Sequence, residues 1–329
     1  MRQLHREMEN FKMVAKTFFG FEELLAKELQ QLGAQEVEPG IRMVAFKGDQ
    51  GFMYKANLAL RTALKILKPI FYFKATNETN LYTGIAKIKW NNYLQPHQTF
   101  VIDTTVHSDY FKHSQFVSQK CKDAIVDQFR NETGQRPSID KDYPDVRINI
   151  HIAKDQVSVA LDTSGASLHH RGYRTATNIA PINEVLAAGM LLLSGWDGQG
   201  DFIDPMCGSG TILAEAAMIA CQIPANINRK EFAFEKWSDW DPDLFATIET
   251  ALLNKVREFH YTITGYDKAP SAVLKAKDNI KNANLQDYIT IQECNFFDTE
   301  KTTKGPLHML FNPPYGERLD IQMERFYAE

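Results

Sequence analysis

The string Asn312-Pro313-Pro314-Tyr315 follows residues 307–311, an apolar run that is typical of a buried strand. The two prolines fix φ and leave the Asn312 side-chain oxygen and the Pro313 carbonyl as acceptors without a competing local helix. Acceptors that hold both N–H bonds of a planar amine favour pyramidalisation of its nitrogen toward an electrophilic methyl group, and Tyr315 offers a face for stacking a flat substrate. The pattern therefore indicates chemistry on an amide or nucleobase amine. A rigid turn is the structural alternative.

A second string, Asp204-Pro205-Met206-Cys207-Gly208-Ser209-Gly210-Thr211, stands where a predicted strand gives way to a helix. Glycines let backbone N–H groups approach a ligand closely, and such turns lie at the carboxyl ends of parallel strands, where open α/β sheets bind cofactors. The dinucleotide fingerprint is broken, because Leu213 stands at its third glycine position. No Gly-Lys-Ser/Thr follows, so the pattern favours neither a dinucleotide nor a triphosphate.

Two more polar residues follow predicted strands. Asp267 ends the strand 262–267, where one carboxylate can accept hydrogen bonds from both hydroxyls of a ribose. Capping of the next helix is the alternative interpretation of Asp267. Asn295 comes just after the strand 289–292, where its amide could reach an adenine ring, although an ordinary loop residue fits the same position.

The elements that would hold these residues alternate between strands and helices. In the first half we expect strands at 13–15, 43–46, 70–73 and 100–103, helices at 20–32, 52–67 and 114–129, and a hairpin of 146–152 with 157–161. Residues 163–181 are expected to connect two domains. After them we expect helices at 184–193, 211–221 and 271–282 and strands at 202–204, 262–267, 289–292 and 307–311. This alternation of helices and strands is typical of an α/β domain.

Charge is distributed unevenly along the 329 residues, whose net charge is −4. Residues 1–176 carry 24 Lys/Arg and 19 Asp/Glu, a net of +5, and residues 177–329 carry 13 and 22, a net of −9. A polyanion would therefore be bound mainly by the first 176 residues. A solvated surface without a ligand is the alternative explanation of this excess of positive charge.

The composition, 44% hydrophobic and 24% charged, is typical of a soluble globular protein. No apolar run approaches the roughly 20 residues of a membrane span, and the N-terminus lacks an export signal, so we expect a cytoplasmic protein. The four cysteines are far apart and form no Cys-x-x-Cys pair, so we expect neither a metal site nor disulfides.

The order of these strings resembles the S-adenosylmethionine-dependent RNA methyltransferases that carry a THUMP domain. Asn312 to Leu319 continues the match as Asn-Pro-Pro-Tyr-Gly-Glu-Arg-Leu. The strings Leu161-Asp162-Thr163-Ser164-Gly165, Arg171-Gly172-Tyr173-Arg174 and Phe232-Ala233-Phe234-Glu235-Lys236-Trp237 resemble the bacterial 23S rRNA guanine-N2 methyltransferases in their unfused form.

The resemblance implies a ferredoxin-like α+β unit (1–69), an RNA-binding THUMP domain (70–165) and a Rossmann-like class I methyltransferase domain (166–329). It assigns Asp204, Gly208, Gly210 and Thr211 to the methionine part of S-adenosylmethionine, Asp267 to its ribose and Asn295 to its adenine, with Asn312, Pro313, Pro314 and Tyr315 on the target amine. Relatives often have Asp at the Asn295 position. Because the family's catalytic sheet continues with further strands, the domain is expected to be incomplete at its C-terminus.

Several interpretations stay open at this point. A tRNA guanine, a glutamine side chain or adenine N6 would each present a planar amine to the Asn-Pro-Pro-Tyr string, and a non-enzymatic RNA-binding protein is a rival of a different class. His169-His170-Arg171-Gly172-Tyr173-Arg174 could contact RNA phosphate or the surroundings of the cofactor, or could be a packed linker. The oligomeric state is not indicated.

Overall fold

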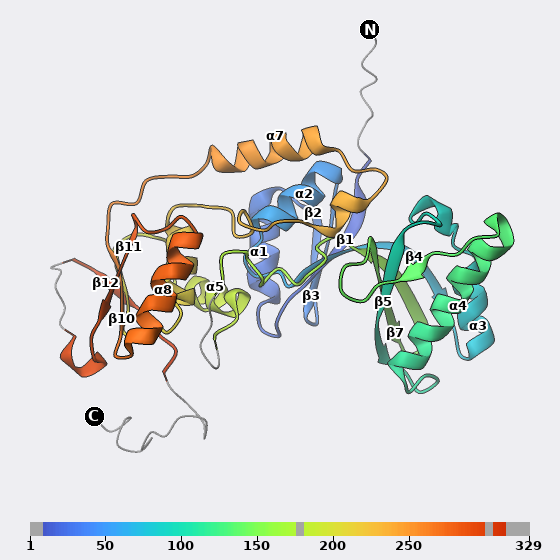
Figure 1. Ribbon diagram of the computed structural model, residues 1–329, viewed down its shortest axis with the longest axis horizontal. Helices are drawn as coiled ribbons and strands as arrows, with labels where there is room; N and C mark the ends of the chain where they lie inside the picture. Colours follow the sequence, from blue (N-terminus) through green and yellow to red (C-terminus); the bar gives the residue numbers. More distant parts are fainter. Residues whose placement is uncertain (1–8, 176–180, 300–304, 314–329) are drawn as a thin grey trace, which may run out of the picture. The chain divides into compact units, whose positions relative to one another are not determined.

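The computed structural model describes residues 9–175, 181–299 and 305–313 (Figure 1). It divides into two compact units. The first unit contains Met1–His170 and Pro224–Asn254, and the second contains Arg171–Ile223 and Lys255–Glu329. The segment Pro224–Asn254 therefore folds with the first unit, although it interrupts the second unit in the sequence. The domain boundaries at 69/70 and 165/166 stay predictions.

The first unit is built on one mixed sheet with the strand order β2-β3-β1-β4-β8-β7-β5-β6. Strand β4 pairs antiparallel with β1 on one side and with β8 on the other, so the first two predicted domains share a continuous sheet. The elements of this unit are β1 (Phe11–Lys16), α1 (Glu22–Leu32), β2 (Gln35–Gly40), β3 (Met43–Gly48), α2 (Gln50–Ala59), β4 (Lys65–Lys74), α3 (Glu78–Ala86), η1 (Trp90–Asn92), β5 (Thr99–His107), α4 (Ser114–Thr133), β6 (Ser138–Ile139), β7 (Val146–Ala153), β8 (Gln156–Asp162), η2 (Ala233–Lys236) and α7 (Pro242–Leu253).

The predicted hairpin is confirmed, because β7 pairs antiparallel with β8 around a turn in which Lys154 has a φ of 56°. The α1 helix ends at Gly33, whose φ of 101° needs the left-handed conformation that glycine adopts without strain. The prediction of one helix over 52–67 is wrong at its end. Leu60 is extended, and Ile66 and Leu67 beyond it belong to β4. A short buried apolar run fits a helix and a strand equally well, and here strand pairing decided the outcome.

The segment Pro224–Asn254, here called the returning segment, completes the core of the first unit. The rings of Phe234 and Trp240 lie 4.7 and 5.1 Å from the ring of Tyr54 on α2, which is fully buried. The Asn226 amide donates to the carbonyl of buried Asn57 at 2.8 Å. The Arg229 guanidinium donates to four carbonyls of residues 164–170, so this stretch of the predicted connection is held within the first unit.

The second unit has a parallel sheet with the strand order β11-β10-β9-β12. Helix α6 is buried along its whole length and packs on β9 and β10. Helix α8 packs on β10 and β11, beside which it is labelled in Figure 1. These contacts confirm the α/β class for this part of the chain. The elements are α5 (Glu184–Leu193), β9 (Asp201–Asp204), α6 (Thr211–Ala220), β10 (Ile263–Asp267), α8 (Pro270–Asn282), β11 (Ile289–Glu293), η3 (Phe296–Asp298) and β12 (Leu307–Met309).

Two glycines before β9 offer a matched test of how tightly α6 is packed. Gly195 and Gly198 share a φ of 83°, but a Cβ on Gly198 would lie 2.8 Å from the Ala220 Cα, whereas a Cβ on Gly195 would meet nothing within 4 Å. Gly195→Ala should therefore cost about 1–2 kcal/mol for the left-handed backbone alone. Gly198→Ala should cost about 1–3 kcal/mol more, because the chain must move off α6. Urea denaturation checks both values, and equal losses would contradict the close approach.

Candidate active site

The four predicted polar positions lie at one edge of the parallel sheet. In the register of the strands, Gly265 pairs with Asp204 and Met309 pairs with Ile203, so the loops after β9, β10 and β12 leave the sheet on the same side. The order of positions along this edge is Asn295, Asp267, Asp204, Asn312. Strands stand about 4.8 Å apart, so this edge is roughly 14 Å long, enough for an extended ligand made of several groups.

The glycine turn between β9 and α6 is closed by backbone hydrogen bonds. The Cys207 N–H donates to the Tyr266 carbonyl and the Gly210 N–H to the Cys207 carbonyl, both at 2.8 Å. Gly208 and Gly210 have φ values of 55° and 81°, a conformation that residues with a Cβ rarely adopt. The turn leads into α6 at Thr211, whose helix N-terminus attracts a negatively charged group.

The Asp267 carboxylate accepts one backbone N–H on each oxygen, from Gly208 at 3.0 Å and from Ala269 at 2.9 Å. The first bond ties the glycine turn to β10. The second holds Ala269, which precedes α8, and not an N–H group of the helix itself, so the capping interpretation is not confirmed. Each carboxylate oxygen has a further lone pair. Asp267 can therefore accept both backbone N–H groups and still accept hydroxyl groups from a ligand.

Asp204 is the most deeply buried acid of the site, with 1% of its surface exposed. Its Oδ1 accepts the Met206 N–H at 3.1 Å. Burial first, and then the charge of Asp267, raise the pKa of the Asp204 carboxyl to about 8. Two carboxylates in one buried corner favour a ligand that brings positive charge and hydroxyl donors, as S-adenosylmethionine does with its α-ammonium and its ribose.

Asn295 and Asn312 stand at the two ends of this edge. Asn295 precedes η3, and its carbonyl accepts the Asp298 N–H at 3.0 Å. Asn312 and Pro313 are half-buried and come shortly after Leu310, whose N–H donates to the Ile203 carbonyl. Pro314 and Tyr315 lie outside the described residues, so their predicted roles stay predictions.

An aromatic pair that was not predicted joins the two ends of the edge. The rings of Phe296 and Phe311 lie 5.6 Å apart, although β11 and β12 stand at opposite sides of the sheet. The loops after these strands therefore meet over the carboxyl ends of β9 and β10. Each ring neighbours a predicted site residue, Asn295 or Asn312, so the pair places an apolar surface beside the predicted cofactor position.

The arginines of the connection pack inside the second unit. Arg171 and Glu215 form an ion pair with a distance of 3.1 Å and no exposed side-chain surface. Arg174 pairs with Glu184 at 3.1 Å and also donates to the Thr211 hydroxyl at 2.6 Å. Arg171 is therefore packed inside the unit, as the packed-linker interpretation expects, whereas Arg174 contacts Thr211, a residue predicted to bind the cofactor.

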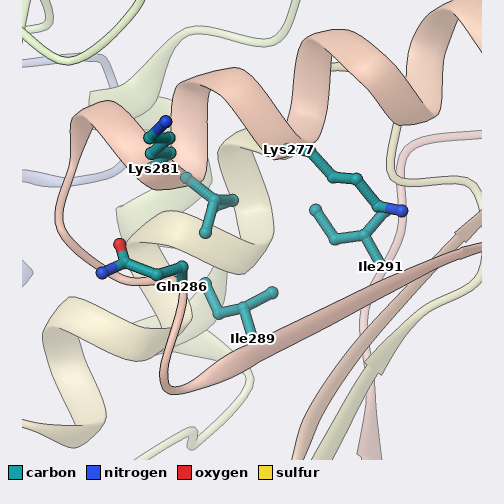
Figure 2. Close-up of a pocket in the computed structure, with 6 residues that line it drawn as sticks. Lys277, Lys281, Gln286, Ile289 and Ile291 are labelled. Atoms are coloured by element: carbon teal, nitrogen blue, oxygen red, sulfur yellow. The ribbon is translucent and has the colours of Figure 1, made fainter.

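A hollow of about 310 Å³ lies between α8 and β11, away from the predicted site residues. Figure 2 shows Lys277 and Lys281 of α8 over Ile289 and Ile291 of β11. None of the predicted site residues lines it, and we assign it no ligand. Within the described part of the chain, no group of three or more His, Cys, Asp or Glu side chains could hold a metal ion, and none of the described helices could cross a membrane.

Comparison with known families agrees with this arrangement. Residues 171–328 match the RMKL-like methyltransferase domain, residues 75–162 the THUMP domain and residues 12–67 the RlmL ferredoxin-like domain. A Synechocystis protein named "Putative RNA methyltransferase slr0064" is 37% identical over 301 residues, which are 91% of this chain and 78% of that protein.

Solved structures show the same similarity. SMU.472, described as a putative methyltransferase in complex with SAH, superposes with a TM-score of 0.85 and 31% identity over 96% of this chain and 84% of its own. A Listeria monocytogenes protein described as a "predicted N6-adenine-specific DNA methylase" superposes with a TM-score of 0.87 and 30% identity over 99% and 85% of the two chains. TrmN from Thermus thermophilus, with 16% identity and a TM-score of 0.65, shares the fold.

Fold, site and relatives together define a class I methyltransferase that uses S-adenosylmethionine. The chain belongs to the RMKL-like methyltransferases in which an RlmL ferredoxin-like domain and a THUMP domain precede the catalytic domain.

The raised pKa of Asp204 predicts that cofactor binding depends on pH. Below about pH 8 the free protein favours the protonated carboxyl, whereas the α-ammonium of the cofactor favours the carboxylate, so binding should release a proton. Affinity for S-adenosylhomocysteine should rise between pH 6 and pH 8, by at most tenfold for each pH unit. Calorimetry in two buffers of different ionisation enthalpy measures the proton, and Asp204→Asn should lose both effects. A pH-independent wild-type affinity would contradict the assignment.

Proposed function

We propose that the protein methylates the exocyclic N2 amine of a guanine in RNA, with 23S rRNA the favoured substrate. The observation that carries this proposal is the position of Asn312 and Pro313 after β12, the strand that pairs with β9 and so stands next to Asp204. In this arrangement the acceptors for a planar amine are neighbours of the acid that faces the methionine part of the cofactor.

The cofactor supplies an electrophilic methyl group on its sulfonium, and the chain supplies position. We assign the methionine part to Asp204, Gly208, Gly210 and Thr211, the ribose to Asp267 and the adenine to Asn295. The Asn312 Oδ1 and the Pro313 carbonyl accept the two N–H bonds of the guanine amine and orient its lone pair toward the methyl group. The surplus proton leaves to solvent after transfer.

The target base must leave its stack to reach this edge. We assign Pro314 the role of stiffening the turn and Tyr315 that of stacking on the extruded base. No nucleophilic side chain is needed, because the methyl group moves directly from sulfur to nitrogen.

The THUMP domain and the relative named as an RNA methyltransferase support an RNA substrate. The excess positive charge of residues 1–176 agrees with them. Adenine N6 is the second candidate, because the Listeria relative is described as acting on that amine in DNA and adenine N6 presents the same planar group. A ribosomal substrate would place the protein in the cytoplasm.

Product analysis tests this proposal directly. The full chain is incubated with S-adenosylmethionine and either protein-free 23S rRNA or tRNA from a strain that lacks the enzyme, and the RNA is digested and its nucleosides are identified by mass spectrometry. We expect N2-methylguanosine from 23S rRNA. N2-methylguanosine from tRNA alone would show that tRNA and not 23S rRNA is the substrate. N6-methyladenosine would show that adenine and not guanine is the target base. RNA binding without any methylated nucleoside would favour the non-enzymatic alternative.

Asn312 separates chemistry from cofactor binding. Asn312→Ala should leave affinity for S-adenosylhomocysteine nearly unchanged and slow single-turnover transfer by a factor of about a hundred or more, because one contact that orients the amine is lost. Asn312→Asp keeps an acceptor and should be milder. Thermal melts serve as the control, since a residue that only shapes the turn would lose stability and activity together. A well-folded Asn312→Ala protein with wild-type rates would refute the role.

A further inference from the structure

The second unit contains two Arg–Glu pairs, and Arg174 of one pair bonds Thr211 at the end of the glycine turn. Arg171 and Arg174 are three residues apart in the chain, and both reach α6. Arg171 binds Glu215, which is one helical turn beyond the start of α6. Arg174 binds Thr211 itself, the first residue of that helix and the last of the glycine turn. The two pairs thus share their chemistry and differ in what they touch.

Arg174 links the first residues of two helices. Its Nη2 donates to the Thr211 Oγ1 at 2.6 Å and to the Ile182 carbonyl at 3.0 Å, and lies 3.1 Å from the Glu184 Oε1. Glu184 is the first residue of α5, just as Thr211 is the first residue of α6. One guanidinium therefore fixes the starts of α5 and α6 with respect to each other.

Glu184 holds Arg174 in this position. Its side chain is 3% exposed, and α5 is anchored just before it by Asn183, whose Oδ1 accepts the N–H groups of Val185 and Leu186. Burial raises the pKa of Glu184 to about 7, while Arg174 lowers it. A buried carboxylate of this kind is retained at low cost only beside a cation, so the two side chains constrain each other.

The bond from Arg174 also sets the direction of the Thr211 hydroxyl. A hydroxyl has one donor and two acceptor lone pairs, and here the oxygen accepts from the guanidinium. Its own hydrogen must then point elsewhere, to an acceptor other than Arg174. A donor polarised by a charged neighbour binds an anion more strongly than an isolated hydroxyl does. At the N-terminus of α6 the fitting acceptor is a carboxylate.

We propose that Arg174 and Glu184 are positioning residues that fix the Thr211 hydroxyl as a donor to the α-carboxylate of the methionine part of the cofactor. The inference rests on the proposed assignment of Thr211 to that part of the cofactor. Arg174 acts through Thr211 and does not itself touch the cofactor. The pair of Arg171 and Glu215 has no such role in this proposal, because Glu215 lies one turn further along α6 than Thr211.

A double-mutant cycle tests the proposal by calorimetric titration of S-adenosylhomocysteine into the full chain. Removing both charges in Arg174→Met/Glu184→Gln avoids leaving one of them buried and unpaired. We expect this variant to bind about tenfold more weakly, and Thr211→Val to do the same, since each removes the polarised donor. The combination should be no more than about twice as weak as either, because both changes remove the same interaction.

The matched control is Arg171→Met/Glu215→Gln, which removes a pair of the same chemistry from the same helix. It should lower the melting temperature and leave affinity for S-adenosylhomocysteine within about twofold. If Arg174→Met/Glu184→Gln does not fold, Arg174→Lys takes its place in the same cycle. Lysine keeps the positive charge beside Glu184 but lacks the planar guanidinium that donates to several acceptors at once.

Losses of affinity that multiply in the combined variant would overturn the proposal, because Arg174 would then contact the cofactor independently of Thr211. Equal loss of affinity in the Arg171 control would overturn it too, since the effect would be one of general stability. Failure of the proposed guanine-N2 activity is a separate result, seen in the methylated nucleoside and not in this binding cycle.

Discussion

Parallel pairing of β9 with β10 on one side and β12 on the other is the constraint on which the site depends. Because these strands run in the same direction, every loop that follows one of them leaves the sheet at the same edge. The site residues extend over more than a hundred positions of the sequence, from Asp204 to Asn312, yet each needs only to end its own strand or to follow it by two or three residues. A shift of β12 by one residue against β9 would move Asn312 by about 3.3 Å and turn its neighbours to the other face.

The same edge concentrates buried carboxylates, and the unliganded fold is destabilised by them. Asp204 and Glu184 both have raised pKa values, with burial as the main cause in each. A carboxyl whose pKa is raised by folding binds protons more tightly in the native state, so its contribution to stability is lost as the pH rises from about 4 toward 8. Arg174 offsets this loss for Glu184. For Asp204 we expect the positive charge of the cofactor to do so, which couples cofactor binding to the stability of the second unit.

Local sequence signals predicted the parts of this molecule that depend on local physics. The strand ends, the glycine turn and the alternating hairpin of β7 and β8 were predicted because they depend on residues that are close together in the sequence. Turn-forming residues and an alternating apolar pattern are both local signals. The helix over 52–67 was wrong because Leu60 and the apolar residues after it satisfy both a helix and a strand, and only pairing of β4 with β1 and β8 distinguishes them. The exposed strand β2 has no alternating apolar pattern and was not predicted. Helix α7 was not predicted either, although Leu244, Ile248 and Leu252 recur at helical spacing. No spacing rule could have paired Phe296 with Phe311 or Arg174 with Glu184, because those contacts follow from the tertiary arrangement.

The returning segment Pro224–Asn254 changes what counts as a folding unit of this chain. Tyr54 and Asn57 on α2 are fully buried, and residues more than 165 positions later supply part of their cover: Phe234 and Trp240 pack on the Tyr54 ring, and Asn226 donates to the Asn57 carbonyl. A fragment that stops at residue 176 would lose these partners and the four hydrogen bonds from Arg229 to the stretch 164–170. Buried aromatic and polar groups left without their partners cost several kcal/mol, which is a large share of the stability of one domain. The basic first half of the sequence is therefore not a complete structural unit, and the RNA binding proposed for it should be tested in a chain that extends at least through Asn254.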